Sequence, residues 1–296
     1  MDAGTFQEDE MTRAYMSFGA GVQSTAIAML AINRDDRLLK VTGGLVPELY
    51  IFADTGDEPK ALYPHVADMK ARIEASGAKF LTVAAKESPL SKYVIEKTIA
   101  GTRAEQLPLF VATTKWALAP LRRGCTAHFK IEPIRRASCE YFKDKLGDVD
   151  MWLGLSYDEP QRLKSGPVAG QLWATYRCPL YDMKWTRAVC LNYLQSVGVT
   201  ARRSACVYCP FHSLNEWRAI KAEPEDWAKA VELDEALERT YAEHGCIGHN
   251  RGEKSRIRGE PFLTQQGRRL RDLDLSVKDD PQQRLWDNEC AGVCGV

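Results

Sequence analysis

The sequence predicts an α/β fold, with a doubly wound and mostly parallel sheet, helices on both faces and a mainly helical, cysteine-bearing C-terminal extension. Three features lead to this prediction. Short apolar runs alternate with helical patterns, a turn of small residues joins the first apolar run to a helix, and the second apolar run ends in acidic residues. Because parallel strands present their carboxyl ends at one edge of a sheet, we expect these two turns to share one ligand site.

Five elements are predicted before residue 84. Apolar runs predict strands at 11–18, 48–53 and 79–83. A helix is predicted at 22–34, and another at 59–75, where apolar residues recur at spacings of three and four until Gly77 closes the pattern. A β-α-β-α-β order of this kind forms a parallel sheet with right-handed crossovers.

Regular patterns return after an irregular stretch. Residues 88–123 have no clear period, and we interpret them as an excursion from the sheet that covers a substrate. Beyond it we predict helices at 131–146 and 186–197, a strand at 149–155, and a helix pair over 214–243 that is broken at Pro224. The chain of 296 residues therefore divides into a large α/β domain, 1–200, and a helical extension, 201–296.

Composition excludes some classes of protein. The 40 basic and 40 acidic side chains cancel, so the chain has no global basic character of a nucleic-acid binder. Its apolar runs are far shorter than the ~20 residues that cross a bilayer, and its first residues do not form a signal peptide, which predicts a cytoplasmic protein without a membrane partner. Nine cysteines in such a chain favour reduced thiols or a metal site over a disulfide framework.

The turn after the first strand is the strongest candidate for a binding site. Small residues let backbone amides approach an anion, and the helix that follows directs its positive end toward that anion, although a plain strand-to-helix connection also uses glycine. Asp54, at the end of the second strand, is expected beside a nucleotide or Mg²⁺, whereas Asp57 and Glu58 fit acids at a helix N-terminus. The candidate phosphate-binding residues are Ser17, Phe18, Gly19, Gly21, Gln23 and Ser24.

Two further motifs carry chemistry. The pair Cys206 and Cys209, followed by proline, can bind a metal ion or an iron–sulfur cluster, form a redox pair, or be two buried thiols. Arg162 follows a Gly-Leu-Ser turn, where a guanidinium suits phosphate or sulfate recognition better than a purely surface role. The basic run 251–271 can contact a nucleic-acid backbone or form a solvated surface.

These motifs resemble a known superfamily. Residues 17–24 are similar to the Ser-x-Gly-x-x-x-Ser pyrophosphate loop (PP-loop) of the adenine nucleotide alpha-hydrolases, and 52–58 resemble the F-x-D-T-G-x-E strand end of the phosphoadenosine phosphosulfate (PAPS) reductase branch. One departure is that Phe18 and Ala20 flank Gly19, which offsets the second glycine of the loop. Further matches follow in order: Gly124-Cys125-Thr126 with Lys130 and Pro133, Gly154-Leu155-Ser156 with Glu159 and Arg162, and Pro179-Leu180 with Trp185.

The resemblance implies cofactors and site residues. It implies a PP-loop nucleotide-binding domain over 1–200 that takes ATP or PAPS with Mg²⁺, and a [4Fe–4S] cluster, with zinc or no metal as alternatives. Cys125 is then the third ligand beside Cys206 and Cys209, and the fourth is Cys290, Cys178, Cys294 or absent. The tail Glu289-Cys290 resembles the reactive Glu-Cys-Gly end of reductive members, so Cys290, Cys294 and Lys130 are the candidate catalytic residues; a frayed tail is the alternative.

The function that follows is an ATP-dependent sulfurtransferase that adenylylates an acceptor and inserts sulfur from a cluster or thiol. The resemblance implies tRNA or DNA as acceptors and a cysteine desulfurase or another protein as sulfur donor. The main alternative is an adenylyl or phosphoadenylyl sulfate reductase that forms sulfite with a tail cysteine. A third is a zinc-stapled nucleic-acid-binding module without catalysis. The sequence leaves the oligomeric state open.

Overall fold

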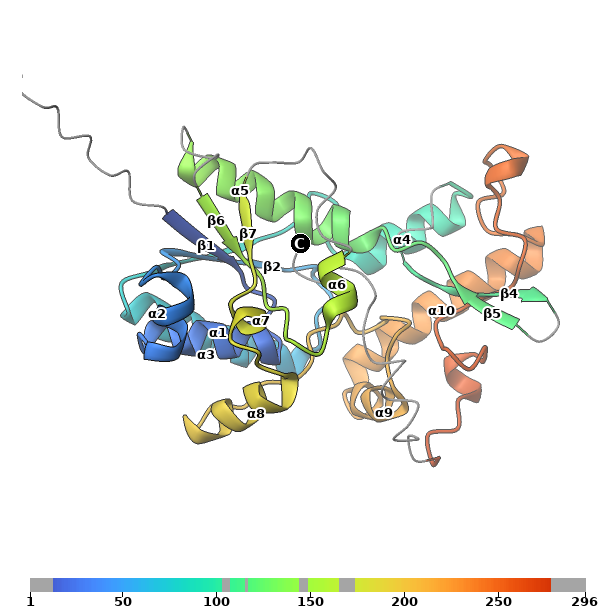
Figure 1. Cartoon of the computed structure of the whole chain (residues 1–296). Coiled ribbons are helices and arrows are strands. Elements are labelled where there is room, and N and C mark those ends of the chain that lie inside the picture. The colour runs from blue at the N-terminus through green and yellow to red at the C-terminus, as the bar shows by residue number, and fades with distance from the viewer. Residues whose placement is uncertain (1–12, 103–106, 115–116, 144–148, 165–173, 278–296) are drawn as a thin grey trace, which may run out of the picture.

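The computed structural model describes residues 13–102, 107–114, 117–143, 149–164 and 174–277 (Figure 1). A five-stranded parallel sheet has the order β3-β2-β1-β6-β7. Its first strand is central, and the chain winds outward from it in both directions, which confirms the predicted α/β fold. The strands are β1 (Arg13–Ser17), β2 (Leu49–Ala53), β3 (Lys79–Val83), β6 (Val149–Trp152) and β7 (Thr175–Arg177).

Helices cover both faces of this sheet. In β1, Ala14 and Met16 belong to one apolar cluster and Tyr15 to another, because successive side chains of a strand point to opposite faces. Helix α5 (Glu132–Phe142) packs on the Tyr15 face (Figure 1). The other face carries α1 (Val22–Ile32), α2 (Asp36–Thr42), α3 (Tyr63–Ala75), α7 (Pro179–Asp182) and α8 (Arg187–Ser196).

Another apolar cluster, called the second apolar cluster below to distinguish it from the packing on the two faces of the sheet, combines two distant parts of the sequence. It joins side chains between Ala85 and Phe129 to others between Val207 and Leu273, with Trp217 fully buried. The small antiparallel sheet β5-β4-β8 shows the same combination, because β4 pairs with β8 from the C-terminal region. The elements here are α4 (Leu90–Ile99), β4 (Phe110–Thr114), β5 (Ala117–Pro120), α9 (Leu214–Lys221), α10 (Pro224–His244) and β8 (Pro261–Phe262).

The structure corrects the prediction of an irregular excursion at 88–123. This stretch contains α4, β4 and β5, whose patterns are short; α4 packs on α10 and β4 pairs with β8, and both of these partners lie far away in sequence. The sequence analysis also missed α2, which begins where the Asp35 carboxylate accepts a hydrogen bond from the Arg37 amide (3.0 Å), and the short β7. The division of the chain at residue 200 stays a prediction.

Other elements agree with the sequence patterns. The helix pair broken at Pro224 is confirmed, because α9 ends at Lys221 and α10 begins at Pro224. Ser213 and Glu216 form a capping box at the start of α9. A π-helical turn, Ala127–Ile131, precedes α5, and α6 (Pro160–Lys164) follows β6. In the part of the chain that the structure describes, no helix is long and apolar enough to span a membrane.

Candidate functional site

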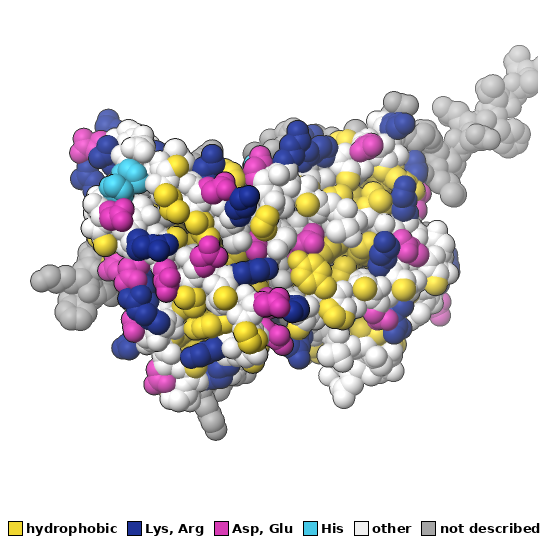
Figure 2. Space-filling view, turned by 180° about the vertical axis from the view of Figure 1, so that it is seen from behind, with side chains coloured by type: hydrophobic (Ala, Val, Ile, Leu, Met, Phe, Trp, Pro, Cys, Tyr) yellow, Lys and Arg dark blue, Asp and Glu magenta, His cyan; other side chains and the backbone are white. Residues whose placement is uncertain are grey.

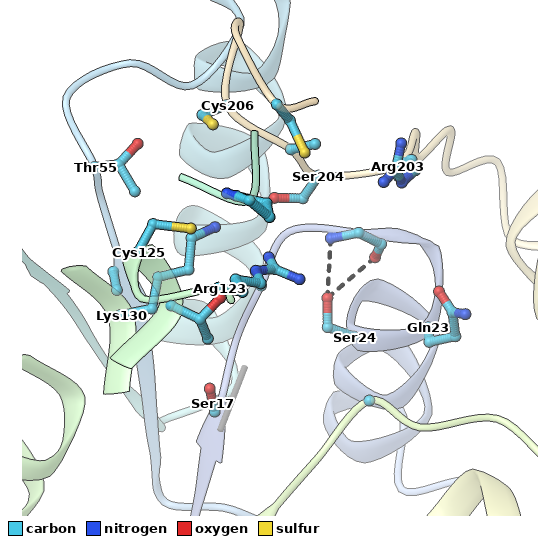
Figure 3. Close-up of a pocket in the computed structure, with 18 of the residues that line it drawn as sticks. Ser17, Gln23, Ser24, Thr55, Arg123, Cys125, Lys130, Arg203, Ser204 and Cys206 are labelled. Atoms are coloured by element: carbon cyan, nitrogen blue, oxygen red, sulfur yellow. Dashed lines mark hydrogen bonds between the residues drawn. The ribbon is translucent and has the colours of Figure 1, made fainter. Parts of the chain in front are cut away.

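A cavity of about 440 Å³ lies at the carboxyl ends of β1, β2 and β6, between the parallel sheet and the second apolar cluster (Figure 3). This volume falls in the range of small-molecule sites. The first turn (residues 17–24) forms one wall, as the sequence predicted. Among the lining residues are Ser17, Phe18, Gly19, Gly21, Gln23 and Ser24 from this turn, and Ala53, Thr55, Lys130, Gly154 and Arg162 from other segments.

The first turn presents the N-terminus of α1 to the cavity. Gly21 is the N-cap residue, and the Ser24 hydroxyl accepts a hydrogen bond from the Gly21 amide (3.0 Å) and donates one to the Gly21 carbonyl (3.1 Å). Ala20 has φ of 55°, a left-handed conformation that is uncommon outside glycine. The ring of Phe18 is buried in the core, 5.7 Å from that of Phe80, so we expect only its backbone to face a ligand.

The turn after β6 packs directly on the first turn. A Cβ atom on Gly154 would lie 3.0 Å from the Ser24 amide nitrogen, so a side chain at this position would push against the first turn. Glu159 links the two turns: its Oε2 accepts from the Gln23 amide (3.2 Å) and the Ser156 hydroxyl (3.0 Å), and it pairs with Arg162. Gln23 is therefore part of a structural link as well as of the cavity wall.

The cavity lining is rich in positive charge. Arg162, a sequence candidate, is 7% exposed and lines the cavity. Arg187 donates to the side-chain oxygen of Gln23 (3.2 Å). The lining contains two acidic side chains, Glu159 and Glu216, and five basic ones, so its net charge suits an anion. The basic residues are Arg123, Lys130, Arg162, Arg187 and Arg203.

Lys130 is held by a buried carboxylate. Its Nζ lies 3.1 Å from Oε1 of Glu58, whose side chain is fully buried, and the Thr55 hydroxyl donates to the same oxygen (3.2 Å). Within the described residues, Oε2 of Glu58 has no hydrogen-bond partner. Glu58 lies two residues before the 3₁₀ turn Lys60–Leu62 that leads into α3, but its carboxylate pairs with Lys130, so it serves more than the role of a helix N-terminal acid.

Asp57 likewise serves a different purpose from the one expected. It is 1% exposed and accepts hydrogen bonds from the amide (2.7 Å) and hydroxyl (3.0 Å) of Ser91 and from the hydroxyl of Tyr208 (2.7 Å). Ser91 belongs to α4, and Tyr208 lies between Cys206 and Cys209. Asp57 therefore joins the end of β2 to two segments of the second apolar cluster.

Asp54 is outside the set of described residues that line the cavity. Its Oδ1 accepts hydrogen bonds from the Gly56 amide (2.8 Å) and the Tyr63 hydroxyl (3.1 Å). These contacts close the turn after β2 and account for the carboxylate without a ligand. The predicted contact of Asp54 with a nucleotide or Mg²⁺ stays a prediction.

Cys125, Cys206 and Cys209 all line the cavity, although Cys125 is distant from the other two in sequence (Figure 3). The Cys206 thiol hydrogen-bonds to the Cys209 sulfur, and this bond, with the charges of His212 and Arg203, holds the pKa of Cys209 well below its usual range. The same hydrogen bond, with burial, raises the pKa of Cys206. The structure thus brings together the three cysteines that the sequence analysis grouped.

His212 has a structural partner. Its Nε2 donates to the Cys206 carbonyl (2.8 Å), so this nitrogen is occupied by a hydrogen bond within the protein. Its Nδ1 faces Oε2 of Glu216 at 3.8 Å. The histidine therefore holds the backbone of the cysteine loop (residues 206–209) through this hydrogen bond.

A metal centre needs several donor side chains close together. Among the described residues, no three His, Cys, Asp or Glu side chains converge closely enough for a single metal ion. A cluster binds each thiolate to a different iron, so its ligands need not converge on one point, and three cysteines that line one cavity fit that arrangement. Cys178 packs in a different apolar cluster, and Cys290 and Cys294 lie outside the described residues.

The basic run 251–271 is largely used within the fold. Arg269 is 5% exposed and contacts Asp234 (3.2 Å) and Glu260 (2.8 Å), and Arg271 forms two hydrogen bonds of 2.6 Å to Glu238. These ion pairs hold the C-terminal segment on α10. Ion pairs within the protein therefore neutralise part of the charge of this run, and Figure 2 shows Lys and Arg side chains interspersed with Asp and Glu on the face that it draws. Both observations favour the solvated-surface interpretation over a nucleic-acid contact.

The chain matches no protein-family model, and no curated protein is significantly similar to it. Several site residues were not assigned from the sequence: Arg203 and Ser204 lie just before the cysteine pair, and Arg123 lies two positions before Cys125. Their closeness to cysteines was the one signal available. Glu58 and Asp57 carried no such signal, because their partners lie in distant segments.

Proposed function

We propose that this chain is an ATP-dependent sulfur-transfer enzyme of the PP-loop type, related to PAPS reductases, that binds a nucleotide in the cavity. The observation that carries the proposal is the meeting of five basic side chains, the N-terminus of α1 and three cysteines in one cavity. A polyanion is favoured by the first two of these features, and sulfur chemistry by the third. The combination matters, because the basic side chains and the helix N-terminus without the cysteines would indicate anion binding only.

The chain's own residues would act mainly by positioning and by neutralising charge. The amides of the first turn and Ser24 hold phosphate oxygens, while Lys130 and Arg162 approach from two other walls. An acceptor oxygen attacks the α-phosphorus, the bond from the α-phosphorus to the bridging oxygen breaks, and pyrophosphate leaves, where Mg²⁺ would neutralise its charge. A hydrosulfide ion from the sulfur donor then attacks the adenylylated acceptor, the bond from the acceptor atom to the AMP oxygen breaks, AMP leaves and the remaining proton passes to solvent. The acceptor thus exchanges oxygen for sulfur with no change of oxidation state.

Cys125, Cys206 and Cys209 would hold a [4Fe–4S] cluster, which when bound would carry the hydrosulfide that the sulfur donor provides. Lys130 keeps its position in the wall through the buried carboxylate of Glu58. The proposed acceptor is tRNA or DNA, and the sulfur donor a cysteine desulfurase or similar protein. Reduced thiols of this kind fit a cytoplasmic enzyme. Cys290 or Cys294 is proposed as a carrier thiol.

The test is anaerobic purification with iron and sulfide quantitation, followed by an ATP–pyrophosphate exchange assay. We expect iron with sulfide, and an exchange rate that falls about 10²-fold in Lys130→Met, because one preorganised cation is lost at the phosphates. Lys40→Met, an exposed lysine of α2, is the matched control and should keep the wild-type rate.

Two other outcomes would replace the proposal. Sulfite formation from adenylyl sulfate without pyrophosphate release would identify a reductase. Zinc without iron, together with no measurable nucleotide binding, would identify a zinc-stapled nucleic-acid-binding module.

A further inference from the structure

The segment 202–204, which connects α8 to the cysteine loop, crosses the first turn. A Cβ atom on Gly21 would lie 3.6 Å from the Ser204 amide nitrogen and 3.8 Å from the Ser204 Cβ, so Ser204 lies beside the first turn across a gap that one added carbon atom would fill. Figure 3 shows Ser204 above the turn that leads to Ser24, with Ser17 below it at the end of β1. Two parts of the chain more than 180 residues apart thus form one cradle.

Both serine hydroxyls lack a partner in the protein. Within the described part of the chain, neither Ser17 Oγ nor Ser204 Oγ has a hydrogen-bond partner, although both atoms are shielded from solvent. Ser17 as a whole is only 3% exposed, and both residues line the cavity. A buried hydroxyl without a partner costs free energy, so its presence on two sides of a cationic cavity points to a ligand that accepts both hydrogen bonds.

The segment that carries Ser204 is held on both sides. Arg203 donates to both carboxylate oxygens of Glu216 (3.0 and 2.9 Å) and to the Phe211 carbonyl (3.1 Å). Three residues beyond Ser204, the Val207 amide donates to the Asp57 carbonyl (2.9 Å). The Ser204 hydroxyl is therefore preorganised over the turn before any ligand arrives.

We propose that Ser204 is a phosphate-binding residue: its hydroxyl donates a hydrogen bond to a non-bridging phosphate oxygen of a nucleoside triphosphate held on the first turn, opposite the hydroxyl of Ser17. This inference rests on the proposed function, because it requires a phosphate in the cavity. It extends the phosphate site from the α/β sheet to the segment that carries Cys206, two residues after Ser204. Phosphate binding then also restrains the cysteine loop.

The test compares the full-length wild type with Ser204→Ala and Ser204→Thr by calorimetric titration with ATP and, separately, with adenosine. Ser204→Ala should weaken ATP binding about tenfold, since a hydrogen bond to a charged oxygen is lost, and leave adenosine binding unchanged. Ser204→Thr should restore ATP binding to within about threefold of wild type, because it keeps the hydroxyl. Ser196→Ala, which removes a hydroxyl from the end of α8 bonded to the Tyr193 carbonyl, is the matched control and should change neither affinity.

Hydrogen exchange adds a second measurement. ATP should slow amide exchange across 202–207 in the wild type and in Ser204→Thr, and should do so less in Ser204→Ala. If wild type binds ATP and Ser204→Ala binds it equally well, this inference is overturned while the proposed function stands. Equal weakening of ATP and adenosine would show a merely structural role and overturn it too. If the wild type binds no ATP, the proposed function itself fails.

Discussion

The two aspartates of the Asp-Thr-Gly-Asp sequence after β2 should differ sharply in their contribution to stability. Asp57 is buried and accepts three hydrogen bonds, two from Ser91 and one from Tyr208. Asp54 closes a local turn, and its donors, the Gly56 amide and the Tyr63 hydroxyl, belong to partly or largely exposed residues. Replacing each aspartate by alanine therefore tests whether the end of β2 is anchored to the second apolar cluster through Asp57.

The magnitude follows from what each substitution leaves behind. Asp57→Ala leaves two hydroxyls and one amide without their acceptor in a buried place, which should lower the free energy of unfolding by about 3–5 kcal/mol. Asp54→Ala lets water replace the carboxylate and should cost about 1 kcal/mol or less. Tyr208→Phe removes one of the three hydrogen bonds and should cost about 1.5–3 kcal/mol.

The assay is urea unfolding followed by tryptophan fluorescence and circular dichroism. With a denaturant slope of about 3 kcal/mol/M, Asp57→Ala should move the midpoint down by about 1–1.7 M. The double variant of Asp57 and Tyr208 should be less destabilised than the sum of the two single variants, because the two side chains share one hydrogen bond. Equal midpoints for Asp57→Ala and Asp54→Ala, or additive single effects, would refute the anchoring role.

Three other expectations can be checked with similar methods. Burial opposes ionisation of Glu216, but the neighbouring His212 and the charge of Arg203 outweigh it and hold the pKa of Glu216 well below the usual 4.5. The contribution of Glu216 to stability is complete above about pH 4.5 and is lost as pH falls, so Glu216→Gln should flatten the acid side of a urea-midpoint profile; parallel profiles would contradict this. Arg269→Met should cost about 3–5 kcal/mol because the buried Asp234 carboxylate loses its counter-charge, whereas Arg268→Met, at the exposed neighbouring position, should change the unfolding free energy by about 0.5 kcal/mol or less; equal costs would argue against the internal ion pairs. Gly154→Ala should weaken ATP binding about tenfold, measured by calorimetry, because its Cβ would displace the Ser24 amide; an unchanged affinity would show that the turn can yield.

Some properties of the site were predictable because they depend on local pattern. Alternating apolar runs placed β1, β2 and β3 close to their observed bounds, and the small residues between Ser17 and Ser24 indicated a turn that opens a helix. The grouping of Cys125 with the cysteine pair came from a resemblance in motif order. In the structure all three cysteines line the same cavity.

Other properties were out of reach of any local pattern. Asp57 and Glu58 look like ordinary acids before a helix, yet their partners Tyr208 and Lys130 lie 151 and 72 positions away in sequence. The pairing of β4 with β8 is equally distant. Such contacts depend on how the parallel sheet packs against the second apolar cluster. A charged residue that forms an ion pair between these two parts has the same local sequence context as one that faces water.

The sequence alone therefore determined the parallel sheet and the small-residue turn after its first strand, because hydrophobic periodicity and glycine conformation act over a few residues. Only the tertiary structure decided that Asp57 stabilises the fold, that Glu58 holds Lys130, and that Ser204 stands over the first turn. Burial changes what a polar group needs, and burial is a property of the packed chain.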